Sequence, residues 1–380
     1  MDRRSRWRLG VLIALGLLGF CADALAGATN PGRNRPTPAA LLTDAERARA
    51  FADRLEALRK EHAIPGLAVT ILRDKETILA GGLGFADVEN QVRVTPHTPF
   101  DIASVTKPLA AVVALRLREK GVLDLNMPMS QVEGFEKFAT EARAEGGIFF
   151  KDFAAGPTPL TLRHLLSMSA NGDPGSRFFY NPVAYSWASR PMAQAAKKPF
   201  SSLMEELVFQ PAAMRRSARI HRNLPLAENL AADLAKPYRK GEQGNMERNT
   251  TPRQPQGDGA AGGVISTAHD LAAFDRALME DKLISPASRN LMWTPAMSSN
   301  GGTLPYGLGW FIQEVQGAKL VWHTGLWEDK YSALYLKIPA QNLTLILLAN
   351  SDGLRWKQDL GEVAIERSDF VMAFLKVFSR

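Results

Sequence analysis

The chain has 380 residues, of which 46% are apolar and 22% are charged, and this ordinary globular composition excludes a disordered, collagen-like or coiled-coil chain. The length suits two domains or one large elaborated domain. The formal net charge of +7 comes from scattered basic residues, without the clustered footprint that nucleic-acid binding needs, so we expect no nucleic-acid partner.

The N-terminus has the pattern of a secretory signal peptide. An arginine-rich start is followed by an apolar run over 9–20 and by Ala24-Leu25-Ala26, an A-x-A cleavage site. The run is too short to span a bilayer. Residues 1–26 are therefore predicted to be removed, leaving an exported, periplasmic or secreted chain without a membrane span. Lipid anchoring at Cys21, the only cysteine, is disfavoured because Phe20 precedes it, where a small residue is usual.

Both ends of the remaining chain contain strand patterns. Residues 27–44, rich in Pro, Gly and Asn, are predicted to be a flexible leader. Thr43 and Glu46 form a capping box that predicts a helix over 45–61. Apolar runs then predict an antiparallel hairpin over 66–72 and 77–80, and further strands over 310–312, 319–322, 332–338 and 343–349. A helix is expected over 360–378.

The middle of the chain has helical patterns instead, over 109–119, 160–168, 201–209 and 267–279. The simplest assembly is an α+β fold with one antiparallel sheet built from both ends and flanked by helices. We therefore predict a sheet domain formed by 45–114 and 256–380, with a helical domain over 115–255 inserted into it.

Several well-known catalytic, metal-binding and nucleotide-binding motifs are absent from the sequence. It has no G-x-S-x-G, H-E-x-x-H or Walker A motif, and its six histidines are dispersed. Residues 257–262 match G-x-G-x-x-G, but they follow a polar loop rather than a strand, which favours a loop near closely packed backbone over a dinucleotide site. The sequence therefore predicts neither a metal site nor a cofactor.

Ser104 and Lys107 form an S-x-x-K pair. On a helix, residues three apart share a face, so the hydroxyl and the amine can meet. A hydroxyl becomes a good nucleophile when a base removes its proton, and lysine can do this when burial lowers its pKa. About one S-x-x-K match is expected by chance in a chain of this composition, so the pair alone is also explained by an ordinary helix start.

The sequence around this pair closely resembles the serine β-lactamase-like family, in the branch of class C β-lactamases, D-alanyl-D-alanine carboxypeptidases and related esterases. The resemblance covers about residues 45–355. The ordered segments that carry it are 98–107, 121–125, 160–166 ("LTLRHLL"), 174–180, 262–271 ("GGVISTAHDL"), 306–310, His323-Thr324-Gly325 and 348–351.

The resemblance implies a role for each matching residue. Ser104 would be the acylated nucleophile, and Lys107 and Tyr180 would together manage its proton, with the identity of the base left open. His323, Thr324 and Gly325 would line the cleft on a strand at the sheet's edge. The backbone amides of Ser104 and Leu326 would form an oxyanion hole, and each such donor lowers the barrier by about 3–4 kcal/mol.

Two departures from the family pattern bear on the substrate. The Y-x-N motif appears as Tyr180-Asn181-Pro182, so either Asn181 contacts the substrate from the neighbouring position or the contact is absent. The K-T-G motif appears as H-T-G, and histidine is largely neutral at pH 7. A fixed cation for a substrate carboxylate is therefore missing, and we expect a protonated His323 to restore it at low pH.

We therefore expect a serine hydrolase that acts through an acyl-enzyme on a small-molecule or peptide ester or amide, more esterase-like than β-lactamase- or carboxypeptidase-like. The alternative is a non-catalytic relative that binds cell-wall peptides or a partner in the same cleft. This alternative stays open because Pro182 stands where the family's Y-x-N motif has an asparagine. Whether the acyl group passes to water or to another acceptor also stays open, as does the oligomeric state. Trp327 and Trp322 are cleft walls or core, and 132–153 is a surface insertion rather than a lid.

Overall fold

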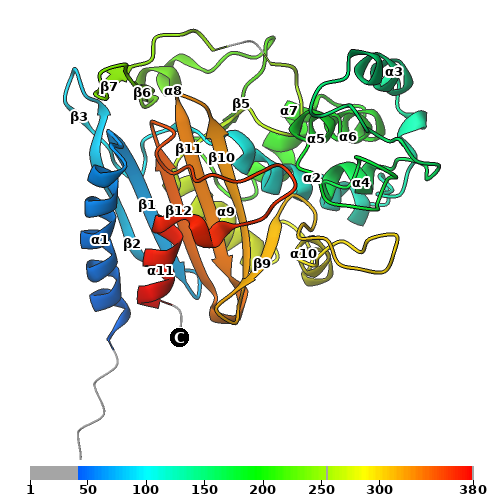
Figure 1. Ribbon diagram of the computed structural model, residues 1–380. Helices are drawn as coiled ribbons and strands as arrows, with labels where there is room; N and C mark the ends of the chain where they lie inside the picture. Colours follow the sequence, from blue (N-terminus) through cyan, green and yellow to red (C-terminus); the bar gives the residue numbers. More distant parts are fainter. Residues whose placement is uncertain (1–41, 254–255, 379–380) are drawn as a thin grey trace, which may run out of the picture. The chain divides into compact units, whose positions relative to one another are not determined.

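An antiparallel sheet of seven strands, built from both ends of the described chain, is the centre of the computed structural model, which describes residues 42–253 and 256–378 (Figure 1). The strand order is β3-β2-β1-β12-β11-β10-β9. The strands are β1 (Gly66–Arg73), β2 (Glu76–Asp87), β3 (Val92–Arg93), β9 (Phe311–Val315), β10 (Ala318–Trp327), β11 (Tyr331–Ile338) and β12 (Leu343–Ala349). Strand β1 pairs with β12 from Leu67↔Ala349 to Arg73↔Leu343, as the two-ended sheet requires.

The apolar runs of the sequence explain why these strands lie at the centre. Strands β11 and β12 are buried at every residue, and β1 at every residue except its last. Such strands are covered on both faces, so they read as continuous apolar runs without alternation. Strand β2, nearer the edge of the sheet, is half-exposed along most of its length.

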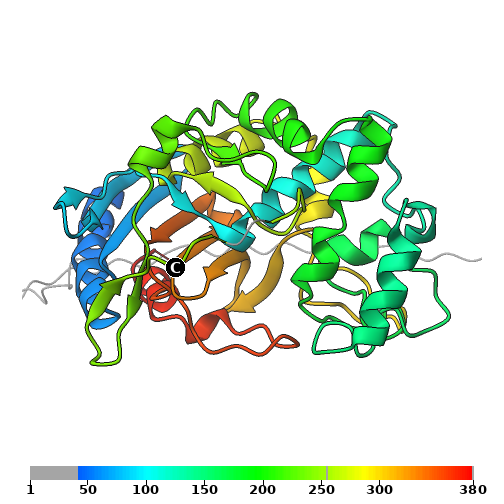
Figure 2. The same cartoon turned by 90° about the horizontal axis from the view of Figure 1, so that it is seen from above.

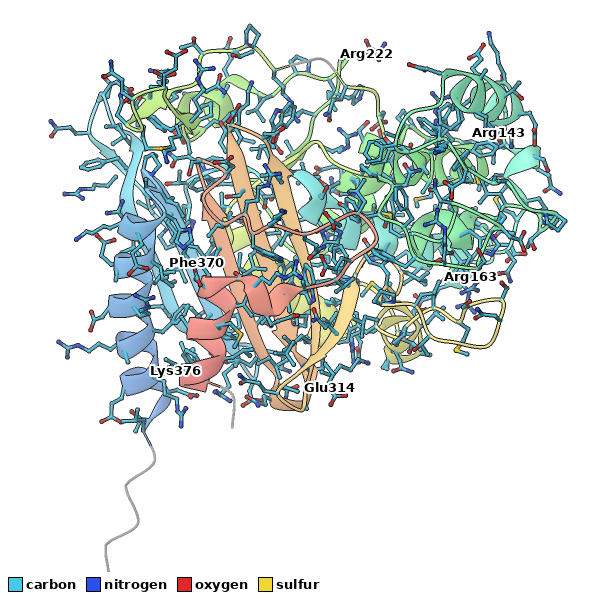
Figure 3. The ribbon with its side chains drawn as sticks, in the orientation of Figure 1. Arg143, Arg163, Arg222, Glu314, Phe370 and Lys376 are labelled. Carbon is cyan, nitrogen blue, oxygen red and sulfur yellow. The ribbon has the colours of Figure 1, made fainter. Side chains whose placement is uncertain are left out.

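Helices cover both faces of the sheet, which confirms the predicted α+β class. Figures 1 and 2 show α1 (Asp44–Glu61) and α11 (Asp369–Phe378) on one side, with α9 (Ala268–Met279) on the other. Thr43 and Glu46 form the expected capping box at the start of α1. The two outer helices pack against each other through aromatic rings. The ring centres of Phe51 and Phe374 lie 5.5 Å apart, and those of His62 and Phe370, which Figure 3 labels, lie 5.0 Å apart.

The middle of the chain holds most of the remaining helices. They are α2 (Thr106–Glu119), α3 (Phe135–Glu145), α4 (Leu162–Leu166), α5 (Pro182–Ser186), α6 (Ser189–Ala196), α7 (Phe200–Met204), α8 (Glu228–Asp233) and α10 (Pro286–Met292). In Figure 1 most of them gather on one side of the sheet, whereas α8 lies above it beside the hairpin over 238–248. The predicted helix over 201–209 is split, since Glu205–Phe209 is a π-helical turn. The boundaries of a separate helical domain stay a prediction.

Among the described residues, five short strands outside the central sheet were not predicted. Strands β4 (Phe100–Asp101) and β5 (Ala218–Arg219) both pair with β8 (Val264–Ser266), and β6 (Tyr238–Lys240) pairs with β7 (Met246–Arg248). Three of them, β5, β6 and β7, lie within the region 115–255 that was expected to be helical. All five strands have two or three residues each, so they are too short for a periodic signal in the sequence.

The C-terminal helix is shorter than predicted. The expectation of a helix over 360–378 is wrong for its first part, because α11 begins at Asp369. Residues 354–364 instead form a loop with a 3₁₀ turn, η5 (Ile365–Arg367), after it. Gly361 lies in this loop, and the Gln358 side chain accepts hydrogen bonds there from Trp356 and from the Ala364 amide, so local contacts replace helical ones.

The predicted signal peptide, its cleavage site, Cys21 and most of the leader lie outside the described residues. Within 42–253 and 256–378, no helix is long and apolar enough to cross a membrane.

Candidate active site

Ser104 lies in a strained turn directly before α2. This 3₁₀ turn, η1 (Ala103–Val105), begins at Ala103, whose φ of 44° is left-handed and rare for a residue with a Cβ. The amide of Ala103 donates to Asp101 Oδ1 at 2.8 Å, and Asp101 is itself buried. Strain of this kind persists where surrounding contacts enforce it, and it places the half-buried Ser104 hydroxyl at the start of the helix.

Gly325 lets β10 approach this turn. A Cβ built on Gly325 would lie only 2.1 Å from the carbonyl oxygen of Ile102, so no other residue fits without moving the backbone. The glycine of H-T-G therefore brings the strand that carries Thr324 and Leu326 against the Ser104 turn.

Lys107 is fully buried one helical turn after Ser104. Its Nζ donates to Ser104 Oγ at 2.7 Å and to the carbonyl oxygen of Ala261 at 2.9 Å. No ion pair joins it to a carboxylate of the described residues. Burial lowers the pKa of Lys107 well below its ordinary value, so a neutral amine is available beside the serine.

Tyr180 lies half-buried beside the same lysine. The Lys107 Nζ atom is 5.1 Å from the centre of its ring, and the ring stacks on Phe311 with centroids 5.7 Å apart. Desolvation raises the pKa of the Tyr180 phenol, opposed by its contact with the Ser104 hydroxyl. Near neutral pH this residue is therefore a proton donor rather than a phenolate. The structure thus brings Ser104, Lys107 and Tyr180 together.

His323 and Asn181 lie behind the site rather than in it. His323 is fully buried, with Nε2 2.9 Å from Tyr306 Oη and Nδ1 2.6 Å from Thr324 O. Burial is the main cause that lowers the pKa of His323 well below 6.5. Protonation at mild acidity is therefore not expected to supply the missing substrate cation.

Asn181 has its side-chain amide fully used by protein contacts. Its Oδ1 accepts from the Ala184 amide, and its Nδ2 donates to Phe149 O and Asn171 Oδ1, all within 2.9 Å. Asn181 caps α5 and anchors it to the 132–153 insertion. That insertion contributes no residue to the two cavities beside Ser104, in line with a surface insertion rather than a lid.

Two cavities meet at Ser104. The first, of about 390 Å³, is also lined by Tyr180, Phe311, Thr324 and Gly325. The second, of about 540 Å³, is lined by Arg219, Trp327 and the glycines of the G-x-G-x-x-G segment. Leu326 and Pro182 border both cavities. Trp327 is thus a cleft wall, whereas Trp322 is fully buried against Phe311.

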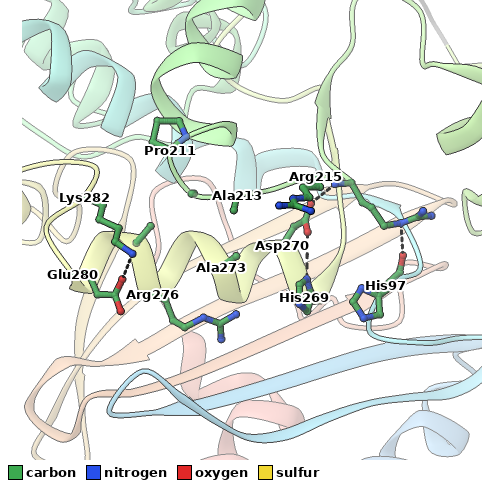
Figure 4. Close-up of a pocket in the computed structure, with 13 residues that line it drawn as sticks. His97, Pro211, Ala213, Arg215, His269, Asp270, Ala273, Arg276, Glu280 and Lys282 are labelled. Atoms are coloured by element: carbon green, nitrogen blue, oxygen red, sulfur yellow. Dashed lines mark hydrogen bonds and ion pairs between the residues drawn. The ribbon is translucent and has the colours of Figure 1, made fainter.

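A larger cavity of about 710 Å³ shares none of these residues. Figure 4 shows that His97 and His269 lie at one end of it and Lys282 with Glu280 at the other. It contains no serine, and two ion pairs lie within it, Lys282 with Glu280 at 2.7 Å and His269 with Asp270 at 3.4 Å. Among the described residues, no group of three or more His, Cys, Asp or Glu is arranged to hold a metal ion.

Two parts of this site were not predicted from the sequence, a backbone carbonyl and a loop. The carbonyl of Ala261 receives a hydrogen bond from Lys107, although the G-x-G-x-x-G segment carried a hint of close backbone approach. The loop 354–360 forms one wall of the smaller cavity, and its Leu360 carbonyl accepts a 2.7 Å hydrogen bond from the Tyr180 amide. The sequence predicts no element over 354–359, and the helix predicted from Leu360 overlooks the break that Gly361 indicates.

A family model and curated relatives match most of the chain. The family model described as Beta-lactamase matches residues 51–366. The chain belongs to the beta-lactamase family. Penicillin-binding protein 4* of Bacillus subtilis (strain 168) is 24% identical over 328 residues, which cover 78% of this chain and 70% of that protein. Several other curated relatives are longer, and the alignments cover between 60% and 63% of their length.

Solved structures of the beta-lactamase family share the fold. D-alanine carboxypeptidase AmpC from Burkholderia cenocepacia matches with a TM-score of 0.65 and 22% identity, over 88% of this chain and 99% of that one. EstCE1, described as a hydrolase with promiscuous acyltransferase activity, matches with a TM-score of 0.64 and 17% identity, over 87% and 98% of the two chains. These likenesses confirm the predicted fold, and the family match identifies the chain as a serine hydrolase of the beta-lactamase and penicillin-binding protein family.

Proposed function

We propose that the chain is an exported serine hydrolase that cleaves an ester or an uncharged amide through an acyl-enzyme on Ser104. The observation that carries the proposal is the 2.7 Å contact between Lys107 Nζ and Ser104 Oγ, made by a lysine with no carboxylate partner among the described residues. Export follows from the signal-peptide pattern of residues 1–26.

In the proposed reaction, Lys107 takes the Ser104 proton while Oγ bonds to the substrate carbonyl carbon. The tetrahedral oxyanion accepts hydrogen bonds from the Ser104 and Leu326 amides. The bond to the leaving group then breaks, and Tyr180, a protonated phenol beside Ser104, donates the proton that the leaving alcohol or amine needs. Lys107 returns a proton to the tyrosine, and water releases the acid in a second half-reaction.

The preference for uncharged substrates follows from the histidine of H-T-G. His323 is buried, both its ring nitrogens are within hydrogen-bond distance of protein atoms, and its side chain lines neither cavity. The cations on the cavity walls are arginines that already have protein partners: Arg219 donates to the carbonyls of Gly257 and Gly259, and Arg355 pairs with Glu328. A carboxylate of a β-lactam or a D-alanyl-D-alanine peptide would therefore lack the charge-assisted bond that is roughly twice as strong as a neutral one.

Covalent labelling tests the proposed nucleophile. Wild-type protein incubated with an activated ester such as p-nitrophenyl acetate is expected to gain one acyl group by intact-mass spectrometry, and peptide mapping should place it on Ser104. Ser104→Ala should gain none, with Ser186→Ala as a matched serine control that is still labelled. A folded wild-type protein that forms no adduct and also releases p-nitrophenol no faster than Ser104→Ala would favour the non-catalytic alternative, a cleft that only binds peptides or a partner.

A comparison of substrates tests the preference. We expect kcat/KM for p-nitrophenyl acetate to exceed that for a chromogenic cephalosporin across pH 5 to 8. Because the pKa of His323 lies well below 6.5, the ratio should not shrink by more than about threefold at pH 5, contrary to the expectation from sequence. A higher value for the cephalosporin would show that the site recognises a carboxylate by another route.

A further inference from the structure

The two cavities that meet at Ser104 differ in chemical character. The 390 Å³ cavity has apolar side chains over much of its wall: Phe311, Leu354, Trp356 and Leu360. The 540 Å³ cavity is the more polar of the two, because Arg219, Glu328 and the glycine segment 257–263 lie on its wall beside Val183 and Trp327. A substrate held across Ser104 therefore places one part against a mainly apolar wall and the other against a mixed wall with charged groups.

Tyr180 indicates which cavity receives the leaving group. The atom that leaves must lie beside the proton donor, and Tyr180 borders the apolar cavity but not the polar one. With Tyr180 as the donor, the alcohol or amine lies in the apolar cavity, and the acyl group extends into the polar cavity beyond Leu326.

The charged residues of the apolar cavity do not offer a free cation. Arg355 on its wall is paired with Glu328 at 2.9 Å, and Glu328 lies on the wall of the other cavity. The remaining charged residue of the wall is Asp359, an exposed carboxylate. An anionic leaving group would therefore have to displace Glu328 and would meet Asp359, whereas an uncharged one meets apolar walls.

Trp356 is the largest side chain that the loop 354–360 places on this wall. Its ring lies 5.7 Å from that of Trp322, and its Nε1 donates to Gln358 Oε1 at 3.3 Å, so its orientation is fixed from two sides. The ring is half-buried, which leaves surface for a ligand. An aromatic wall of this kind gains binding free energy by burying apolar groups, at about 25 cal/mol per Å².

We propose that the substrates are esters or amides with an uncharged, apolar alcohol or amine as leaving group, bound in the 390 Å³ cavity, and that Trp356 determines this preference. The inference rests on the proposed function, since it assigns the two sides of the Ser104 acyl transfer. The loop 354–360 thus acts in two ways: it forms the leaving-group wall, and its Leu360 carbonyl holds the backbone of the proton donor Tyr180.

A series of acetate esters isolates the leaving group. Ethyl, butyl, hexyl and 2-phenylethyl acetate share one acyl group, and their alcohols have nearly equal pKa values, so differences in kcat/KM report contacts of the alcohol. For wild-type protein we expect 2-phenylethyl acetate to exceed ethyl acetate by about 10- to 100-fold. In Trp356→Ala this ratio should fall to within about threefold of one, with ethyl acetate hydrolysis retained.

Trp327→Ala is the matched control, because it removes an indole from the other cavity. It should keep the wild-type ratio of 2-phenylethyl to ethyl acetate within about threefold. Trp356→Leu, a milder change that keeps an apolar wall, should give an intermediate ratio and covers the case that Trp356→Ala disturbs Tyr180. A ratio that is unchanged in both Trp356 variants, or lost in Trp327→Ala instead, overturns the assignment.

Failure of this assignment is separable from failure of the proposed function. If wild-type protein neither forms an adduct on Ser104 nor releases p-nitrophenol faster than Ser104→Ala, the proposed function fails. If the adduct forms but the ester ratio does not depend on Trp356, the acyl-enzyme stands and the leaving-group assignment alone is wrong.

Discussion

Two buried lysines near the central sheet differ in whether a carboxylate reaches them. Lys337 on β11 forms an ion pair with Asp275 on α9, and both side chains are almost completely enclosed. Lys107 on α2 contacts a hydroxyl and a backbone carbonyl instead. A buried lysine is held as a cation where a carboxylate compensates it, and it tends to lose its proton where none does.

The groups around the two lysines are otherwise alike. Lys107 has the Ser104 hydroxyl and the Tyr180 ring as neighbours. Lys337 donates to Thr344 Oγ1 at 2.9 Å, and Tyr335 Oη donates to the same Asp275 carboxylate at 2.5 Å. A hydroxyl, a lysine and a tyrosine suit the proposed nucleophilic site where no carboxylate compensates the lysine; where Asp275 does so, they form a structural ion pair.

Replacing each lysine by methionine separates these roles, and it has the largest expected effect. Lys107→Met should lower kcat/KM for p-nitrophenyl acetate by about 10³-fold or more while the protein stays folded, because the base is lost. Lys337→Met should leave kcat/KM of the folded protein within about threefold. It should lower the free energy of unfolding by about 3–5 kcal/mol, because Asp275 then stays buried without its partner.

Steady-state kinetics and urea unfolding of both variants measure the two quantities. The double variant Lys337→Met with Asp275→Leu should recover part of the lost stability, since no buried charge is left unpaired. Equal losses of activity in the two single variants would mean that the carboxylate does not distinguish the two lysines.

The sequence could predict the local parts of this comparison. Apolar runs located most of the central strands, and the S-x-x-K spacing located Ser104 and Lys107 on one face of a turn and helix. The alternation of a strand could also have placed His323 correctly, because successive side chains point to opposite faces and Thr324 and Leu326 line the cavity.

The parts that depend on distant segments could not be read from the sequence. The Ala261 carbonyl reaches Lys107 across 154 residues, and Asp275 reaches Lys337 across 62. Neither pairing leaves a periodic or compositional signal. Nothing in the sequence therefore says which of the two lysines lacks a carboxylate, and that difference decides which one can serve as a base.

The two tyrosines give the second test. Tyr180→Phe should lower kcat/KM by about 10²-fold, because the leaving group loses its proton donor. The fall of kcat/KM at acid pH should keep its midpoint, since it belongs to Lys107. Tyr335→Phe, the matched control, should leave kcat/KM unchanged and cost about 1.5–3 kcal/mol of stability, because it removes a buried hydrogen bond to the Asp275 carboxylate. A loss of the acid limb in Tyr180→Phe would instead identify Tyr180 as the base.

The third test concerns the free energy of unfolding that the protein loses by keeping Lys107 neutral and buried. Burial lowers the pKa of Lys107 in the folded protein, whereas in the unfolded chain it is about 10.4. Between these two values the unfolded chain binds a proton that the folded protein does not, so stability falls as pH falls. This loss of stability is absent above about pH 10.4, and it stops growing once the pH falls below the pKa of Lys107 in the folded protein.

Urea unfolding of wild type and Lys107→Met from pH 9 to pH 6 measures this cost. Lys107→Met removes the titration, so its stability relative to wild type should increase as pH falls, by at most about 1.4 kcal/mol per pH unit. The pH at which the difference levels off gives the pKa of Lys107 in the folded protein. It should coincide with the midpoint of the acid limb of kcat/KM, because both report the same amine in the free enzyme. Two midpoints more than one pH unit apart would show that another group is the base, and the absence of a carboxylate beside Lys107 would then not explain the chemistry at Ser104.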